Sequence, residues 1–498
     1  MSGKTKYSWL VALAAGIGGF LFGYEIGVIG QVLGMESFKT DFNLNDASTQ
    51  SSHVAWVTTS FLFGCIGGAA IFSVLADRIG RKYSIISSGL FFAMGGALQC
   101  SANSFAVLLA GRVLSGVSIG TASMVVPLYM AETAPAATRG ALTTIYQLMI
   151  TFGIFVASCV NSIIIKTVED RSSTGWRMAL AMQIIPSIFL VILVYFIPFS
   201  PRWLAEKGRH EEGLEVMAKL RGLSVHDQAV VDEYNLIREA SEIDKAIGEA
   251  SWGELFRGTN GKRMLIAMLN QSLQQLTGIN VILYYSVQIF QAMGFDHADT
   301  LIAFPLANSF VNFIATFPGM WAVDRYGRKP LLVWGGLGMA VGHAGVYTFL
   351  TLSSKEGSQL LAWGAIISVY IFLVSFASTW GPVVWSYQAE IFPLRVRAKG
   401  TGFATVTNWT WNAIIAYAFP FVFSALDKQP SVYWIFFTFC LGMSAWAWYF
   451  VPETKGLTLE EVGEVFGDKP MAAQRNTHYV STDLKSRFST NQMYVHHQ

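Results

Sequence analysis

The chain has 498 residues, of which 53% are hydrophobic and only 13% are charged. A soluble protein of ordinary composition carries about 25% charged residues, so this composition excludes a typical soluble enzyme and a disordered chain. The 34 Lys and Arg nearly balance the 32 Asp and Glu, for a net charge of +2. Such a balance gives no bulk attraction to nucleic acid. We therefore expect a protein of the lipid bilayer with no nucleic-acid partner.

Twelve apolar segments are each long enough to cross a bilayer, which takes about 20 residues. In chain order they lie near 9–33, 55–75, 84–101, 106–128, 141–165, 178–198, 264–290, 301–322, 331–352, 361–387, 400–424 and 433–451. The first segment is too long for the core of a signal peptide, so we expect it to remain as a helix. The expected fold is an all-α membrane protein with twelve transmembrane helices.

The positive charges of the loops indicate the orientation of the chain. Lys and Arg residues concentrate in the tails and in the loops on the same side as the tails, even when the long central loop is left out. Positive loops remain in the cytoplasm during membrane insertion. We therefore expect both termini to be cytoplasmic.

One long hydrophilic stretch, 199–263, divides the twelve spans six and six. We expect an N-terminal six-helix half over 1–198 and a cytoplasmic linker over 199–263, with short charged helices near 211–221 and 233–247. A C-terminal six-helix half follows over 264–452. The remaining residues, 453–498, are expected to form a cytoplasmic tail that is largely disordered after about residue 466.

Three sequence motifs recur at matching positions in the two halves, which indicates an internal repeat. An Asp-Arg-x-Gly-Arg-Lys motif follows the second span at 77–82 and the eighth span at 324–329. A Glu-x-x-Pro-x-x-x-Arg motif begins at Glu132 after the fourth span and at Glu390 after the tenth. The sixth and twelfth spans end in the segments PFSPRWLAEKGR and PETKGLTLEEV. Three matched pairs favour two pseudo-symmetric halves.

The charges of these motifs suit a cytoplasmic gate. The acidic residues can pair with arginines of neighbouring loops, and such pairs would clamp the two halves together and release as the halves rock apart. The alternative is plain anchoring by solvated charges, which requires neither acidic partners nor a repeated spacing. The gate residues predicted in this way are Asp77, Arg81, Glu132, Arg139, Asp324, Arg328, Glu390 and Arg397.

Polar residues inside the spans are the candidates for a binding site, because a polar side chain in a bilayer is costly unless it faces a partner or a wet cavity. The spans carry neutral amides and tryptophans: Gln147, Gln274, Gln275, Asn280, Asn312, Trp385, Asn408 and Asn412. Amides match the hydroxyls of a sugar ring, and an indole face covers its C–H patch. The alternative for each amide is a hydrogen bond that joins two helices.

Charged residues inside the spans are scarce. Glu25 lies in the middle of the first span and is the one clear carboxylate deep in a span, while Arg112 in the fourth span is the one deep cation. A phosphate or carboxylate substrate would need more cations than this. If Glu25 and Arg112 pair in one conformation and separate in another, the carboxylate could take up and release a proton in each cycle. The alternative is a static ion pair that holds two spans together.

These motifs resemble those of the sugar porter family within the major facilitator superfamily, over roughly residues 9–465. The paired Asp-Arg-x-Gly-Arg turns mark the superfamily, whereas SPRWL, PETKG and QQLTGIN (274–280) are more specific to sugar porters. The family usually has Glu where this chain has Phe199, so one ion pair of the gate is expected to be absent. The resemblance is to fungal and bacterial members, and it implies a multi-pass protein of the plasma membrane.

The resemblance also implies roles for particular residues. At the matching positions the family binds sugar, with Phe22 as a pocket wall and Tyr284 and Tyr285 as the external gate. The residues that would bind sugar are Gln147, Gln274, Gln275, Asn280, Asn312, Trp385 and Asn412. Proton-coupled members have an Asp at the position of Glu25 and an Arg at that of Arg112. The residues themselves predict two bends: Gly278 allows the seventh span to bend, and Gly381-Pro382 gives the tenth span a hinge because proline lacks a backbone donor.

The expected function is a proton-coupled symporter for a monosaccharide, a hexose such as glucose, that works by alternating access. No cofactor, metal or catalytic residue is implied; the coupling ion is a proton, and we expect a monomer in the bilayer. The alternatives are an uncoupled hexose uniporter, because some yeast facilitators keep the acid, and a transporter-like sugar sensor. The Gly-x-Ser-x-Gly match at 116–120 lies mid-helix, where no nucleophile elbow forms, so we expect no enzyme.

Overall fold

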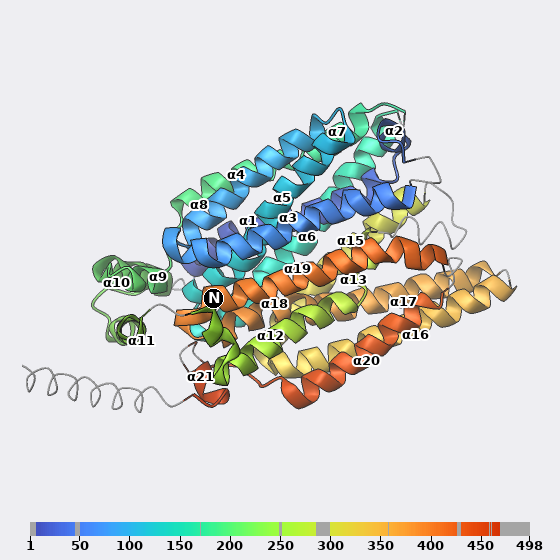
Figure 1. The fold of residues 1–498 in the computed structure, drawn as a ribbon. Helices are drawn as coiled ribbons and strands as arrows, with labels where there is room; N and C mark the ends of the chain where they lie inside the picture. The colour runs from blue at the N-terminus through green and yellow to red at the C-terminus, as the bar shows by residue number, and fades with distance from the viewer. Residues whose placement is uncertain are drawn as a thin grey trace, which may run out of the picture.

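The computed structural model is helical throughout the part of the chain that it describes and contains no strand there. The described residues are 6–44, 50–169, 171–248, 251–284, 299–356, 358–425, 430–457, 459 and 461–468. Most helices are long and run side by side along one direction, as a bundle does (Figure 1). The predicted all-α fold is confirmed.

The first half of the chain supplies six positions of the bundle. The sixth position is made of two helices, α7 (Thr174–Ala181) and α8 (Ile184–Phe196), and a short helix, α2 (Glu36–Asp41), packs beside α7. The other five helices are α1 (Lys6–Val32), α3 (Gln50–Ile79), α4 (Arg81–Cys100), α5 (Phe105–Thr133) and α6 (Arg139–Thr167).

The second half supplies the other six positions. Its helices are α12 (Gly258–Leu276) with α13 (Ile279–Tyr284), α15 (Phe304–Tyr326) after a π-helical turn at Asp299–Ala303, α16 (Arg328–Glu356), α17 (Gln359–Ser378) with α18 (Trp380–Ile391), α19 (Leu394–Ala425) and α20 (Val432–Phe450). Within the described residues, nine stretches are long and apolar enough to cross a membrane. The other three predicted spans correspond to α12 with α13, to α16, and to α19. Several of the amides lie in α12, α13 and α19.

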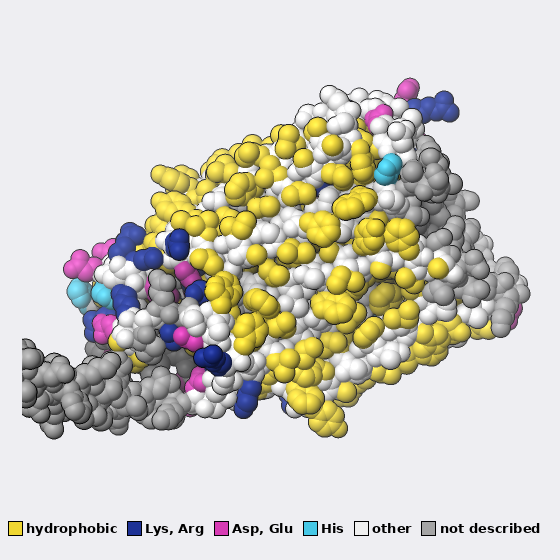
Figure 2. Space-filling view, viewed as in Figure 1, with side chains coloured by type: hydrophobic (Ala, Val, Ile, Leu, Met, Phe, Trp, Pro, Cys, Tyr) yellow, Lys and Arg dark blue, Asp and Glu magenta, His cyan; other side chains and the backbone are white. Residues whose placement is uncertain are grey.

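The outside of the bundle is apolar where lipid would cover it. Hydrophobic side chains dominate its middle, while charged side chains gather near the two ends (Figure 2). Large side chains such as Phe196 and Leu360 are 75% and 81% exposed. Exposed apolar patches of this extent are not found on soluble monomers. The surface therefore fits a bilayer.

One end of the bundle carries the linker helices, and we name it the charged end. It bears α9 (Pro201–Glu206), α10 (His210–Arg221), α11 (Gln228–Ile247) and α21 (Val462–Val465), and the N-terminus of α1 lies there too (Figure 1). The Ser8 hydroxyl donates to the Leu220 carbonyl at 2.5 Å, which ties α1 to α10. The two charged linker helices predicted from the sequence are present. We call the opposite end, which carries α2, the far end.

Besides the sixth position, two positions in the second half of the bundle are interrupted. α12 and α13 are separated at Gly278, whose φ of +83° favours glycine, and this is the bend expected from the sequence. α17 and α18 are separated at Thr379, not at Gly381-Pro382 as the sequence predicted. The hinge prediction was wrong by two residues because Pro382 lies in the first turn of α18, where a missing N–H breaks no helical hydrogen bond.

Glycines let several helices approach until their backbones touch. A Cβ added to Gly23 of α1 would lie 1.8 Å from the Ile150 carbonyl oxygen of α6, and one added to Gly64 of α3 would lie 2.1 Å from the Val113 oxygen of α5. Small residues at such crossings are the usual means of close packing in membranes. Gly67, one turn along α3 from Gly64, has nothing within 4 Å of its added Cβ.

We expect Gly23→Ala to destabilise the folded protein by about 1–3 kcal/mol, because the added methyl group meets backbone that cannot give way. Gly67→Ala is the matched control, since it adds the same atoms in open space. Thermal melting in detergent should show a clear loss for Gly23→Ala and none for the control. A native melting temperature for Gly23→Ala would contradict the close crossing of α1 and α6.

Candidate functional site

A cavity lies between the two halves, near the middle of the bundle, and residues of both halves line it. Phe22 of α1 and Gln147 of α6 come from the first half, whereas the other polar lining residues come from the second. The cavity is lined by Phe22, Ile26, Gln147, Ile150, Ile154, Gln274, Gln275, Ile279, Asn280, Leu283, Asn312, Phe376, Trp385 and Asn412. No charged residue is among them.

Behind this lining the amides of the second half form a connected network. Gln275 donates to Asn408 Oδ1 at 2.9 Å, and Asn408 donates to Gln274 Oε1 at 2.9 Å and to Gln271 Oε1 at 2.6 Å. Gln271 in turn donates to Gln388 Oε1 at 2.6 Å. A satisfied network of this kind fixes its members in place. The side chains that reach the cavity are therefore held in defined orientations.

Two oxygens at the cavity remain available for a ligand. Asn312 Oδ1 and Asn412 Oδ1 are buried and have no hydrogen-bond partner. Gln147 lies against Gly381, where an added Cβ would come within 3.0 Å of the Gln147 amide nitrogen. A buried polar atom without a partner costs free energy, which a ligand with hydroxyl groups would recover.

The structure brings together all the predicted sugar-binding residues except one. Asn408 does not line the cavity; it lies behind Gln274 and Gln275 and bonds to both. Asn408 therefore positions Gln274 and Gln275 and does not contact a ligand in the cavity itself. Sequence reasoning missed Gln271 and Gln388, which complete the network, and the aromatic wall Phe376. A signal was available for both, since Gln271 is a polar residue within the predicted span 264–290 and Gln388 directly follows the span 361–387.

Aromatic side chains close the cavity on several sides. Trp385 lies with its ring centroid 6.1 Å from that of Tyr146 in an edge-on arrangement, and Phe22 lies 5.1 Å from Trp409. Trp409 itself donates to the Ser123 hydroxyl of α5 at 3.0 Å, which joins the two halves. These rings offer apolar faces beside the amides, as the recognition of a pyranose requires.

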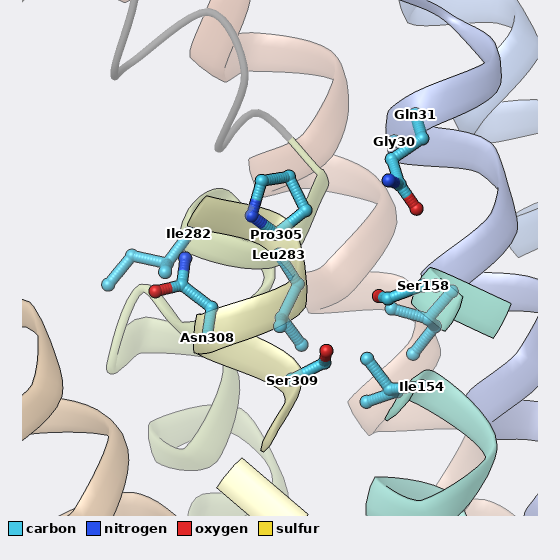
Figure 3. Close-up of a pocket in the computed structure, with 11 residues that line it drawn as sticks. Gly30, Gln31, Ile154, Ser158, Ile282, Leu283, Pro305, Asn308 and Ser309 are labelled. Carbon is cyan, nitrogen blue, oxygen red and sulfur yellow. The ribbon is translucent and has the colours of Figure 1, made fainter. Parts of the chain in front are cut away.

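A second, smaller cavity lies next to the central one, toward the far end, and shares Ile26, Ile154 and Leu283 with it. Gln31 and Ser158 border it from α1 and α6, facing Pro305 and Ser309 of α15 (Figure 3). Gln31 Nε2 donates to the Leu301 carbonyl at 3.0 Å and so connects the two halves at this end.

The predicted external gate can be assessed for one of its two tyrosines. Tyr284 ends α13, is buried, and lies close to α1: an added Cβ on Gly30 would be 3.6 Å from the Tyr284 carbonyl oxygen. Tyr285 lies outside the described residues. α13 therefore packs against α1 beside the second cavity, which Gly30 and Leu283 both line.

Glu25 of the first span faces Arg112 of the fourth. Arg112 Nη1 donates to Glu25 Oε1 at 2.6 Å, and both residues are buried. Phe22 and Ile26, on either side of Glu25 in α1, line the central cavity, whereas Glu25 itself points to α5. Glu25 Oε2 has no partner, and the Arg112 guanidinium also lies 5.2 Å from the Phe61 ring centroid. The expected pair is thus present beside the cavity.

The charged end contains two clusters related by the internal repeat. In the first, Arg81 contacts Asp77 and Glu132, each at 3.0 Å, and Glu132 accepts from Ser200. In the second, Arg328 lies 3.7 Å from Asp324 and 2.7 Å from Glu390, and Glu390 accepts a hydrogen bond from Thr454. Ser200 and Thr454 occupy the same place in the related segments PFSPR and PETKG.

The ion pairs that Arg81 and Arg328 make with Glu132 and Glu390 lie within a half, so these two pairs do not join the halves in this conformation. The motif spacing could not distinguish the two arrangements, because each arginine begins the helix after the turn that carries its own acid. The halves are joined by other contacts of the same motifs. Asp324 accepts from the backbone N–H of Ala141 at 2.9 Å, and Arg139 donates to the Leu457 carbonyl at 2.9 Å.

The replacement at Phe199 makes the two clusters unequal. Glu453, its counterpart, accepts from the backbone N–H groups of Arg328 and Lys329 at the start of α16. Phe199 instead stacks on Trp203 at 5.0 Å. Glu206, one turn beyond, brings its carboxylate to 3.8 Å from Arg81. The first half therefore has an acid near Arg81, although it comes from a different position.

Comparison with known proteins identifies relatives over nearly the whole chain. Residues 11–466 match the family model described as Sugar (and other) transporter. A low-affinity glucose transporter of Kluyveromyces lactis is 34% identical over 476 residues, covering 92% of this chain and 82% of that protein. The hexose transporter HXT10 of Saccharomyces cerevisiae is 35% identical, covering 92% and 85%. The major facilitator-type transporter ecdD of Aspergillus rugulosus is 34% identical, covering 93% and 88%.

Solved structures of the proton:xylose symporter XylE are similar in fold. XylE bound to 6-bromo-6-deoxy-D-glucose matches with a TM-score of 0.83 and 29% identity, covering 93% of this chain and all of that chain. The inward open conformation of XylE from E. coli matches with a TM-score of 0.69 and 29% identity, covering 91% and 99%. The present conformation is thus more similar to the sugar-bound structure than to the inward open one.

Burial raises the pKa of Glu206 to about 8; Arg81 opposes this shift, and Asp77 and Glu132 add to it. Because this pKa lies above the usual glutamate value of 4.5, the folded state holds more protons than the unfolded state between the two values. Stability should therefore fall as the pH rises through this range. We expect the melting temperature of the native protein to decrease more between about pH 5 and pH 8 than that of Glu206→Gln.

The control for this measurement is Glu211→Gln, which removes an exposed carboxylate of α10 at the same end of the bundle. This variant should keep the native dependence of melting temperature on pH. If Glu206→Gln also kept it, Glu206 would not carry the shifted pKa.

Proposed function

We propose, for a chain that belongs to the sugar (and other) transporter family, that it carries a neutral hexose such as D-glucose across the membrane together with a proton. The transport cycle alternates access to the central cavity from the far end and from the charged end. No covalent step is involved. The protein acts as a monomer in the plasma membrane, with the charged end and both termini in the cytoplasm.

The observation that carries the proposal is the chemistry of the central cavity. Its polar lining consists of neutral amides from both halves, with a tryptophan in the wall and no charged residue. Amides can donate to and accept from each hydroxyl of a sugar, and the unpartnered oxygens of Asn312 and Asn412 are free to accept. A site that hydrogen-bonds hydroxyl groups also rejects analogues that lack them, because its own polar atoms would then stay unsatisfied.

Alternating access is supported by the contacts that join the halves at the two ends. The halves meet through Asp324 and Arg139 at the charged end and through Gln31 at the far end. A hydrogen bond between neutral groups contributes only about 0.5–1.5 kcal/mol, and one to a charged group about twice that, so bonds of this kind can break at one end as they form at the other. The interrupted helices α12–α13 and α17–α18 border the cavity, as broken helices do in transporters whose sites lie at mid-membrane.

The pair of Glu25 and Arg112 supports coupling to a proton. If Glu25 binds a proton, the 2.6 Å bond to Arg112 loses its charge attraction, and α1 is free to shift against α5. Because Phe22 and Ile26 of α1 line the cavity, such a shift changes the sugar site directly. The Phe61 ring keeps the guanidinium in place when the carboxylate is neutral.

Coupling changes what the transporter can achieve. One charge moved inward across 100 mV is worth ~2.3 kcal/mol. Since ~1.4 kcal/mol corresponds to a tenfold ratio, this supports roughly 40-fold accumulation of sugar. A uniporter would stop at equal concentrations on the two sides. Uncoupled hexose transport is the second candidate. It would follow if the Glu25–Arg112 pair stayed intact throughout the cycle and served only to join α1 to α5.

The test of coupling is Glu25→Gln in liposomes with an inward proton gradient. The native protein should accumulate labelled D-glucose above the external concentration, and a protonophore should abolish this accumulation. Glu25→Gln should still exchange sugar across the membrane but should not accumulate it, because the amide cannot carry the proton. Uphill uptake by Glu25→Gln at the native level would refute the proton role of Glu25.

Glu25→Asp is the control, because it retains a carboxylate at the same place. It should keep accumulation that depends on the gradient. If the native protein equilibrates glucose without accumulating it, the result supports a uniporter. If it moves no sugar at all, the result supports a sugar sensor.

A further inference from the structure

The break between α12 and α13 leaves backbone groups that need partners inside the membrane. A helix that ends cannot satisfy its last carbonyl groups by itself, and the bilayer core offers no water to do so. At this break the Thr277 hydroxyl donates to the Gln274 carbonyl at 2.7 Å, and the Gly278 N–H donates to the Gln275 carbonyl at 3.2 Å. The Thr277 carbonyl takes its partner from another helix.

That partner is His343 of α16. Its Nε2 lies 2.8 Å from the Thr277 carbonyl oxygen, and the side chain is fully buried. A carbonyl oxygen only accepts hydrogen bonds, so Nε2 carries the hydrogen. Nδ1 is buried and has no partner. The imidazole therefore serves as a neutral donor toward the break.

Aromatic rings hold the imidazole in this position. The ring centroid of His343 lies 4.5 Å from that of Phe372 in α17 and 5.6 Å from that of Phe436 in α20. The Phe436 ring also covers Gly278, where an added Cβ would come within 2.9 Å of it. The back of the break is thus enclosed by α16, α17 and α20 of the same half.

The front of the break faces the sugar site. Gln274 and Gln275 end α12, whereas Asn280 begins α13, and all three line the central cavity. The Asn280 amide donates to Gln275 Oε1 across the break. The angle between α12 and α13 therefore decides whether these amides converge on one ligand.

From this arrangement we propose that His343 is a positioning residue of the sugar site. Its hydrogen bond to Thr277 fixes the angle of the break, so that Gln275 and Asn280 present their amides together. The inference rests on the proposed function, since the readout is the affinity for sugar. It goes further by giving a role to a buried histidine that touches neither the cavity nor the Glu25–Arg112 pair.

The test compares two replacements of His343 in the full-length transporter reconstituted in liposomes. His343→Leu fills the space but cannot donate, whereas the amide of His343→Gln can donate to the same carbonyl. We expect KM for labelled D-glucose to rise about tenfold in the leucine variant, which corresponds to about 1.4 kcal/mol. In the glutamine variant KM should return to within about threefold of the native value, because a direct donor is restored.

The control is Trp446→Phe, which removes the 3.0 Å hydrogen bond from α20 to Asn270 Oδ1 of α12, away from the break. It should leave KM unchanged. A leucine variant with native KM would overturn the proposal, as would a glutamine variant as impaired as leucine. If His343→Leu is not recovered folded, His343→Met replaces it with the same expectations. The two claims are tested separately. Glucose uptake by the native protein tests the proposed function, whereas the ratio of variant KM to native KM tests the role of His343.

Discussion

The structure depends on one constraint: a polar group inside the bilayer has to find its partner within the protein. The amides of the second half meet this constraint by bonding to one another through Asn408 and Gln271. Glu25 and Arg112 meet it by pairing, and the interrupted helix meets it through His343. The oxygens of Asn312 and Asn412 are buried without a partner, and both residues line the central cavity. At the central cavity, these two unpartnered oxygens are groups that a bound ligand can satisfy.

The internal repeat gives the molecule its mechanical organisation. Each half carries its own arginine cluster at the charged end, with Arg81 bound to Glu132 and Arg328 bound to Glu390. Because these strong pairs lie within a half, each half can move as a rigid unit. The halves are joined by weaker contacts, such as that of Asp324 with Ala141. Rigid halves with weak contacts at both ends suit a protein that exposes a central cavity alternately to each side.

Much of this arrangement could be predicted from the sequence, since apolar length and repeated motifs reflect local physics. The twelve spans, the linker helices and the break at Gly278 are of this kind. Most of the cavity residues were found because an amide in a span has few other uses. The partners of the arginines at the charged end could not be found, because spacing along the chain does not say which half a neighbouring loop belongs to. For the same reason His343 gave no signal: its partner, Thr277, lies in another helix.

The central claim is that the cavity binds a neutral sugar through uncharged hydrogen-bonding groups. Competition for labelled D-glucose binding to the purified protein tests it most directly. Unlabelled D-glucose should displace the label, whereas D-glucose 6-phosphate should not, because no cation lines the cavity to offset the burial of a phosphate. Equal displacement by the two compounds would contradict the account, as would the absence of saturable glucose binding.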